Sequence, residues 1–275
     1  MNRALVAAVA CLLAACGPSR DTLPSGAGLP VGADDAFAAF IQATRFCAGI
    51  RTLTAEMAVS GTAGSTRVRV RVTAGLLLPD SARLEAVAPF GAPLFVLAAG
   101  AGDATLFLPR DRRALRHGAP RAVFEAVTGL PLDAADLAAL LTGCADPAEW
   151  SDLRRYGATW QVMTSHTDEL FLHRENETAP WRLVARVRRL AGGRRWREEF
   201  GDYRDGTPRA IRITSLDDAK LAAPFDLRLG LSQVDLNVSL GADVFAVAIP
   251  TSALPITLDE LRHSGPLGGG EADGR

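Results

Sequence analysis

The feature that most restricts the fold of this chain is a strict alternation of charged and apolar residues. Residues 67–72 read Arg-Val-Arg-Val-Arg-Val. Successive side chains of an extended strand point to opposite faces, so this run predicts a strand with one dry face and one solvated face. Shorter runs of the same kind recur along most of the chain, separated by Gly, Pro and Asp turns. The chain is therefore expected to be mainly β, with short antiparallel strands.

Apolar residues at helical spacing interrupt this pattern at three places. The first is an amphipathic run over 36–47, preceded by an Asp-Asp pair at 34–35 that we expect to cap a helix. The other two form a helix pair in mid-chain, over 120–127 and 134–141, with Asp133 starting the second helix.

The number and order of these elements predict the fold class. About eleven short strands, an N-terminal helix and an inserted helix pair favour a mainly β (α+β) protein. We expect an open antiparallel β-barrel or half-barrel, with the helix pair closing its mouth. The alternation changes phase at Ser232-Gln233, and a one-residue slip reverses the faces of a strand, so a bulge or turn is predicted there.

The first fifteen residues have the layout of a secretory signal. Arg3 precedes an apolar stretch over residues 4–15, which is too short to cross a hydrocarbon core of about 30 Å. The stretch ends in Leu-Ala-Ala followed by Cys16, which resembles the bacterial lipobox, whose cysteine is lipidated. We expect residues 1–15 to be removed and Cys16 to carry the lipid. The alternative is an ordinary secretory signal with a cysteine there by chance.

The residues after Cys16 predict the domain limits and the location. Gly17 stands where an Asp would favour retention in the inner membrane of many Gram-negative bacteria, so the lipobox resemblance implies the periplasmic face of the outer membrane. Residues 16–33 are rich in Gly, Pro and Ser and are predicted to be a lipidated flexible tether. Residues 34–263 are the predicted barrel domain, and 264–275 a disordered tail.

Two cysteines remain in the predicted domain, Cys47 and Cys144. An even pair outside the cytoplasm favours a structural disulfide. The alternative is two buried thiols.

Charge and motifs exclude several classes of function. The formal net charge of −1 gives no field that would favour nucleic acid. The sequence contains no zinc-protease, P-loop, nucleophile-elbow or dinucleotide-binding motif, and its four histidines lack metal-ligand spacing. We therefore predict no enzymatic activity, no metal and no cofactor.

An arginine-rich hairpin covers residues 186–197. Such a run favours a solvated outer face. Attraction to anionic lipid is the alternative.

The order of helix, six strands, helix pair and remaining strands resembles the LolA/LolB family of lipoprotein carriers and receptors, most closely the outer-membrane lipoprotein LolB. The local match comprises Ala-Pro-Phe-Gly at 88–91, Val-Thr-Gly-Leu-Pro-Leu at 127–132 and an apolar helix ending in Gly over 137–143. Residues 244–250 are also similar to the closing segment of such domains. The family's open barrel has an aliphatic cavity for acyl chains, so the resemblance implies lipid binding.

The resemblance also implies a membrane-inserting loop formed by Pro89, Phe90 and Gly91. The receptor carries an apolar residue on this loop to deliver its cargo, and Phe90 occupies that position here. In the alternative interpretation, Phe90 folds back under the loop and packs in a small local core.

The alternation suggests which leucines would line a lipid cavity. An aliphatic lining suits acyl chains because it leaves no polar group without a partner. The candidates are Leu84, Leu106, Leu108, Leu183, Leu227 and Leu229. A core filled by these same side chains is the alternative.

These observations predict a lipoprotein that binds acyl chains and assists transfer of lipoproteins or lipids into the outer membrane. Its expected partners are acyl chains of lipoproteins or lipids, the inner leaflet of the outer membrane and a soluble periplasmic carrier. The alternative function is that of an envelope lipoprotein that uses the same barrel as a non-transporting interaction scaffold or sensor.

Overall fold

The structure, a computed structural model, describes residues 22–87, 93–146, 148–190, 193–216 and 224–264. Their strands form one sheet, in the order β1-β8-β9-β10-β11-β12-β13-β14-β2-β3-β4-β5-β6-β7-β15. The strands are β1 (Leu29–Pro30), β2 (Thr52–Ala63), β3 (Thr66–Leu77), β4 (Ser81–Val87), β5 (Pro93–Gly100), β6 (Asp103–Leu108), β7 (Arg113–Gly118), β8 (Asp152–Tyr156), β9 (Trp160–Thr164), β10 (Asp168–His173), β11 (Arg182–Arg189), β12 (Arg195–Gly201), β13 (Ala210–Ser215), β14 (Phe225–Leu236) and β15 (Leu254–Pro255).

The described sheet is open, as the sequence predicts, because β1 and β15 lie at its two edges without pairing to each other. Neighbouring strands are antiparallel except β15, which runs parallel to β7. The predicted number of about eleven strands is too low, since the described sheet has fifteen. Three of the strands that the sequence does not indicate are β1 and β15, with two residues each, and β8, which reads Asp-Leu-Arg-Arg-Tyr, so none of these three has an apolar alternation to detect.

Four α-helices accompany the described sheet. Three of them match predicted helices, and the fourth follows the last strand. They are α2 (Ala33–Thr44), α3 (Pro120–Thr128), α4 (Ala134–Thr142) and α5 (Leu258–Ser264), with short 3-10 turns η1 (Cys47–Gly49) and η4 (Ala242–Phe245).

Local capping determines where the helix pair begins and ends. Asp133 is the N-cap of α4 and accepts a hydrogen bond from the backbone N–H of Asp136, while the Asp136 side chain reaches back to the Asp133 backbone. Both helices end at a glycine in the left-handed region, Gly129 with φ 78° and Gly143 with φ 68°. The predicted helix pair is therefore confirmed.

The capping prediction for the first helix is wrong. The N-cap of α2 is Gly32, which makes no side-chain cap, and the two aspartates lie inside the first helical turn. Carboxylates in that turn are stabilised by the positive end of the helix dipole, which explains why they occur there without capping the helix.

The phase shift near Ser232 is a bulge within one long strand. The pairing of β14 with β2 shifts register between Ser232 and Asp235, and Gln233 has a φ of 47°. The strand ends at Leu236, so the alternation that the sequence continues to Leu240 does not extend the sheet.

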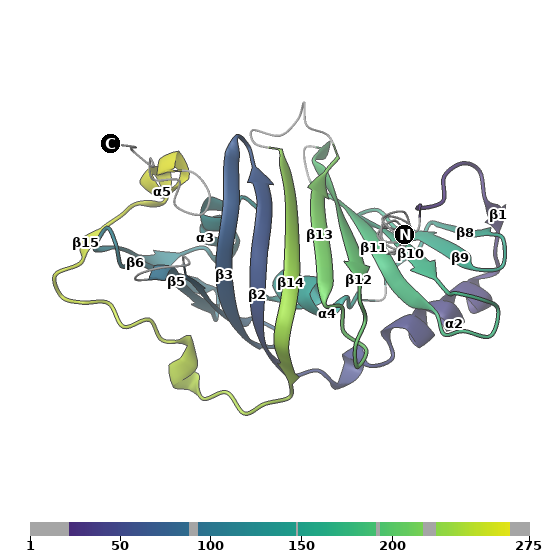
Figure 1. Cartoon of the computed structure of the whole chain (residues 1–275), viewed down its shortest axis with the longest axis horizontal. Helices are drawn as coiled ribbons and strands as arrows, with labels where there is room; N and C mark the ends of the chain where they lie inside the picture. The colour runs from purple at the N-terminus through teal and green to yellow at the C-terminus, as the bar shows by residue number, and fades with distance from the viewer. Residues whose placement is uncertain (1–21, 88–92, 147, 191–192, 217–223, 265–275) are drawn as a thin grey trace, which may run out of the picture.

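The main core lies between the inner face of the sheet and the helices. Figure 1 shows β3, β2, β14 and β13 across the front of the molecule, with α3 and α4 behind them. The C-terminal helix α5 packs against α3, and Leu261 and Ile256 are buried in the same core. The C-terminal helix therefore packs against α3 of the helix pair.

Part of the predicted tether is ordered. Leu29 and Pro30 form β1 and pair with Arg155 and Arg154 of β8. A sheet edge exposes unpaired backbone groups, and these two residues satisfy some of them. The last part of the predicted tether therefore contributes an edge strand to the sheet.

Some predictions concern residues outside the described ranges. These are the signal peptide 1–15, the lipidated Cys16, the loop of Pro89, Phe90 and Gly91, and the tail beyond Ser264. Among the residues that the structure does describe, no helix is both long enough and apolar enough to span a membrane.

Candidate functional site

An apolar cavity lies between the centre of the sheet and the helix pair. Its floor is formed by inward-facing side chains of β2, β3, β4, β5, β13 and β14, and its roof by α3, α4 and their connection. The lining residues are Met57, Val59, Val70, Val72, Leu84, Phe95, Phe124, Thr128, Leu130, Leu132, Leu137, Leu140, Ile213, Leu227 and Leu229. We call α3, α4 and their connection, residues 120–142, the helix lid.

The lining presents no polar group that needs a partner from a ligand. Thr128 is its one side chain with a polar atom, and its hydroxyl donates to the backbone carbonyl of Phe124 at 2.7 Å. A surface of this kind favours hydrocarbon, because nothing polar loses its hydrogen bonds when a chain enters.

The cavity is small in this conformation, with a volume of about 70 Å³. An engineered apolar cavity of about 150 Å³ holds benzene. A long acyl chain therefore does not fit under the helix lid as it stands, and its entry requires the lid to move away from the sheet.

The structure brings three of the six predicted leucines to this cavity: Leu84, Leu227 and Leu229. Leu106 and Leu183 are buried elsewhere in the core, on β6 and β11, and Leu108 is half-buried at the end of β6. The alternation identifies the face of a strand but not its position across the sheet, and the cavity lies only under the central strands. Leu106, Leu108 and Leu183 therefore do not line this cavity.

The sequence reasoning missed the residues of the roof. Phe124, Leu130, Leu132, Leu137 and Leu140 come from the helix lid. The sequence carries a signal for them, since the lid is an apolar helix pair inserted into a β series, but the pattern predicts only that this pair closes the mouth of the barrel.

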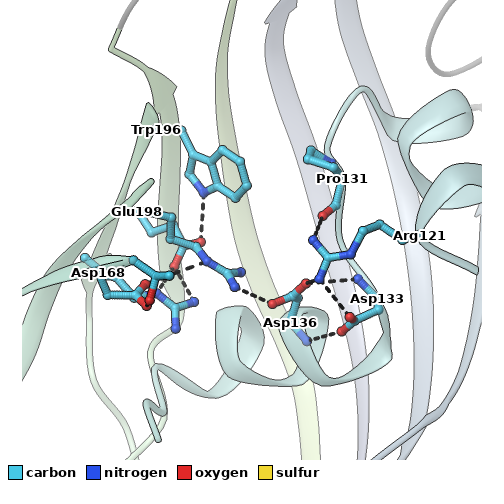
Figure 2. A network of polar contacts seen from close by, with 10 residues as sticks. Arg121, Pro131, Asp133, Asp136, Asp168, Trp196 and Glu198 are labelled. Atoms are coloured by element: carbon cyan, nitrogen blue, oxygen red, sulfur yellow. Dashed lines mark hydrogen bonds and ion pairs between the residues drawn. The ribbon is translucent and has the colours of Figure 1, made fainter. Parts of the chain in front are cut away.

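A network of charged side chains fastens the helix lid to the sheet beside this cavity (Figure 2). Asp136 of α4 lies at its centre. One carboxylate oxygen accepts from Arg121 of α3 at 2.7 Å, and the other forms a short ion pair with Arg188 of β11. Arg121 also donates to Asp133 at 2.8 Å and to the carbonyl of Pro131 at 2.7 Å. The two helices are thereby joined to each other and to the sheet.

A second ion pair lies deeper, on the inner face of β11 and β12. Arg186 donates to Glu198 at 2.7 Å, and the side chains are 6% and 1% exposed. Glu198 also accepts from the indole N–H of Trp196 at 2.9 Å, which Figure 2 shows. The prediction that the whole arginine-rich hairpin is a solvated outer face is therefore wrong at Arg186.

The positions of these charges explain the directions of two pKa shifts. Burial lowers the pKa of Arg188, but the carboxylates of Glu198 and Asp136 outweigh it, and the pKa lies above its ordinary value. Burial raises the pKa of Asp133, but the backbone N–H of Asp136 and the Arg121 guanidinium outweigh it, and the pKa lies below 3.8. Both groups are charged at neutral pH.

A disulfide fastens the other end of the lid. Cys47, at the start of η1, is bonded to Cys144, the residue after the glycine that ends α4. The pair is the one that the sequence favours as a disulfide, and its Cα atoms lie 5.8 Å apart. The C-terminal end of α4 is therefore covalently tied to the segment that leads into β2.

Comparison with known proteins gives a match in structure. No family model matches this chain, and no curated protein matches it. A LolA superfamily protein from Nitrosomonas europaea is similar to it, with a TM-score of 0.54 and 12% identity over 77% of this chain and 97% of that chain. The chain has a LolA-type fold.

A second solved structure supports this fold. It comes from Vibrio parahaemolyticus and is described as an outer membrane lipoprotein-sorting protein domain. Its TM-score is 0.50 and its identity 13%, over 76% of this chain and 97% of that chain. At these identities the likeness is one of fold, so it supports the predicted LolA/LolB-type architecture and leaves the LolB-like role to be proposed.

Proposed function

We propose that this protein is a lipid-anchored envelope protein that takes an acyl chain into the cavity under its helix lid and assists lipoprotein or lipid transfer into the outer membrane. The observation that carries the proposal is the lining of that cavity, in which every side chain is apolar except Thr128, whose hydroxyl is bonded within its own helix. The structural relative described as a lipoprotein-sorting domain is consistent with such a role. The proposal includes no catalytic step.

The helix lid is the part that must move. Two ion pairs join it to the sheet side, Asp136 with Arg188 and Glu125 with Arg194, while Cys144 ties the end of α4 to Cys47. If both ion pairs open and the disulfide stays intact, α4 turns away from β14 about its C-terminal end. This motion enlarges the cavity without releasing the lid from the protein.

The energetics favour transfer over storage. A palmitoyl-length chain contributes about 12 kcal/mol at about 0.8 kcal/mol per buried CH₂ group. A bilayer offers nearly the same gain, so net binding is a small difference between two large terms. The lid is closed when the site is empty, so opening it reduces the net free energy of ligand binding further. A small net gain suits a protein that passes its ligand on.

The proposed anchor is Cys16. Labelling with a palmitate analogue should occur in the unmodified chain and fail in Cys16→Ser. Equal labelling of both chains would contradict the anchor, although the cavity proposal would stand.

The proposed delivery element is Phe90 in its Pro/Gly loop. Phe90→Glu is expected to abolish insertion of cargo into vesicles while cargo binding continues, because a carboxylate is costly to place in hydrocarbon. Normal insertion by this variant would show that the loop has no delivery role.

Native mass spectrometry tests the proposal. The chain from position 16 onward, carrying Cys16→Ser, is incubated with palmitate and transferred to the gas phase from a volatile buffer. We expect a peak with one added palmitate. A chain that stays empty and takes up no fluorescent fatty acid would contradict the carrier function.

The cavity volume of about 70 Å³ favours a second candidate function. A chain whose lid never opens would use the same fold as an interaction scaffold. The two functions predict opposite results in the palmitate experiment, which therefore separates them.

A further inference from the structure

We propose that the outer face of β14, β2 and β3 is a docking surface for the anionic headgroups of a phospholipid membrane. This inference goes beyond the proposed function and does not depend on the cavity. It concerns Arg67, Arg69 and Arg71 of β3 and Arg228 of β14, which we call the arginine face.

The sheet register places these four side chains on one surface. Arg67, Arg69 and Arg71 alternate with buried valines and are all exposed. Arg228 pairs with Ser60 of β2, which pairs with Arg69 on its other side. Neighbouring strands lie about 4.8 Å apart and alternate residues about 7 Å apart, so the four guanidinium groups cover a patch about 10 by 14 Å.

The arginines of this face have no partner among the described residues, unlike several arginines on nearby strands of the sheet. On the neighbouring strands, Arg212 pairs with Asp226 at 2.7 Å, Arg197 with Glu199 at 3.2 Å and Arg83 with Glu85 at 3.4 Å. The four arginines of the face form no hydrogen bond or ion pair with any described residue. Two carboxylates border this face in the register: Glu56 of β2, diagonal to Arg71, and Asp226 of β14, two residues from Arg228 and paired with Arg212.

Other parts of the outer surface are covered by the chain itself. The carbonyls of Val244 and Ala246 accept hydrogen bonds from Arg83, so the segment around η4 lies over β4. On β9 to β11 a small cluster of Val162, Phe171, Ala185 and Val187 packs with residues such as Leu23. Figure 1 shows no described element crossing in front of β3, β2 and β14.

The composition of the patch favours a headgroup layer over a protein partner. The positions between the arginines hold small residues, namely Ala58, Ser60, Thr62 and Gly230. Protein interfaces are centred on buried aromatic or other large anchors, and this patch has none. A phosphate layer supplies only charge and hydrogen-bond acceptors, which the planar guanidinium fork fits closely.

Vesicle cosedimentation tests the proposal. The chain from position 16 onward, carrying Cys16→Ser so that no acyl anchor contributes, is mixed at low salt with vesicles of phosphatidylcholine alone or with equal phosphatidylglycerol. Each basic residue near an anionic surface strengthens binding about fivefold. We expect binding only to the phosphatidylglycerol vesicles and about a hundredfold weaker binding by R67Q/R69Q/R71Q.

The matched control is R45Q/R116Q/R155Q, which removes three exposed arginines from elsewhere in the chain. It should bind within about fivefold of the unmodified chain, and circular dichroism confirms that both variants are folded. If both triple variants lost vesicle binding to the same extent, binding would depend only on the net charge of the protein, and the proposal would be overturned. Absence of phosphatidylglycerol-dependent binding would also overturn it, and an acidic protein would then be the partner to seek.

Palmitate uptake is expected to be unchanged by R67Q/R69Q/R71Q, so failure of the membrane-docking proposal is distinct from failure of the cavity proposal.

Discussion

Asp136 of α4 and Arg188 of β11 form an ion pair across the boundary between the helix lid and the sheet. The two side chains are 11% and 17% exposed, so water screens their attraction only in part. Asp136 also accepts from Arg121 of α3, and a change at this carboxylate is therefore felt by both helices. The position of this pair beside an apolar cavity makes it the natural contact to break when the lid opens.

Removal of the sheet side of this pair should make the lid easier to open. Arg188→Gln loses a charge-assisted hydrogen bond of about 1.5 kcal/mol, which corresponds to about a tenfold larger open population. Uptake of a fluorescent fatty acid, followed by stopped flow, is expected to be about tenfold faster. Arg189→Gln is the control, because Arg189 pairs with Glu169 on the sheet and not with the lid. Equal rates in the two variants would contradict the role of the ion pair.

A large side chain in the cavity should block the ligand. Leu229→Trp adds an indole to a space of about 70 Å³, and we expect fatty-acid uptake to be abolished. Overpacking costs about 1–3 kcal/mol of folding free energy. Leu183→Trp is the matched control, since Leu183 is also buried but does not line the cavity. Urea unfolding should report similar destabilisation of the two variants, while uptake is lost only in the first.

The buried pair of Arg186 and Glu198 predicts an asymmetric effect on stability. Glu198→Gln leaves the Arg186 cation buried without a counter-charge, and breaking such a pair costs about 3–5 kcal/mol. The double variant R186M/E198M removes both charges and is expected to lie close to the unmodified chain. Urea unfolding measures the free energy of unfolding of the single and the double variant. A double variant as unstable as Glu198→Gln would show that the pair itself stabilises the fold.

The lid is expected to loosen in acid. The pKa of Asp133 lies below its ordinary value of 3.8, because its hydrogen bonds and Arg121 favour the carboxylate against the effect of burial. A group with a lowered folded pKa stabilises the native state above its unfolded pKa and loses that contribution as the pH falls through the folded pKa. The protection factors of the α4 amides, which compare their hydrogen exchange with that of an unfolded chain at the same pH, should therefore fall below about pH 3.8.

Asp133→Asn supplies the control for this pH dependence. Asn is a good N-cap and does not titrate, so the protection factors of α4 in this variant should depend much less on pH over the same range. An equally steep acid response in Asp133→Asn would assign the loosening to other carboxylates.

Local features of this fold were predictable from the sequence, whereas the position of the cavity was not. The limits of α4 follow from Asp133 and Gly143, which act within a single turn, and the β14 bulge follows from a phase shift that needs no knowledge of the partner strand. The cavity depends on which strands become central in the sheet. Leu183 and Leu229 have equivalent alternation, yet only Leu229 reaches the lining.

The polar network was only partly predictable. Glu198 lies in phase with Trp196 and Phe200, so the alternation places a carboxylate on an apolar face, and that is a signal for a buried partner. The identity of the partner depends on the pairing of β11 with β12, and the contact between Asp136 and Arg188 joins residues far apart in the chain. Such contacts follow from the assembled fold and not from any local pattern.

The central claim is that an acyl chain enters the cavity between the helix lid and the sheet. The most direct test is photocrosslinking with a palmitate analogue that carries a diazirine near the end of its chain, followed by peptide mapping. We predict adducts on both walls, at residues such as Leu137 of α4 and Val70 and Leu227 of the sheet. Adducts confined to exposed apolar side chains, such as Phe37 and Ile41 of α2, would contradict the claim.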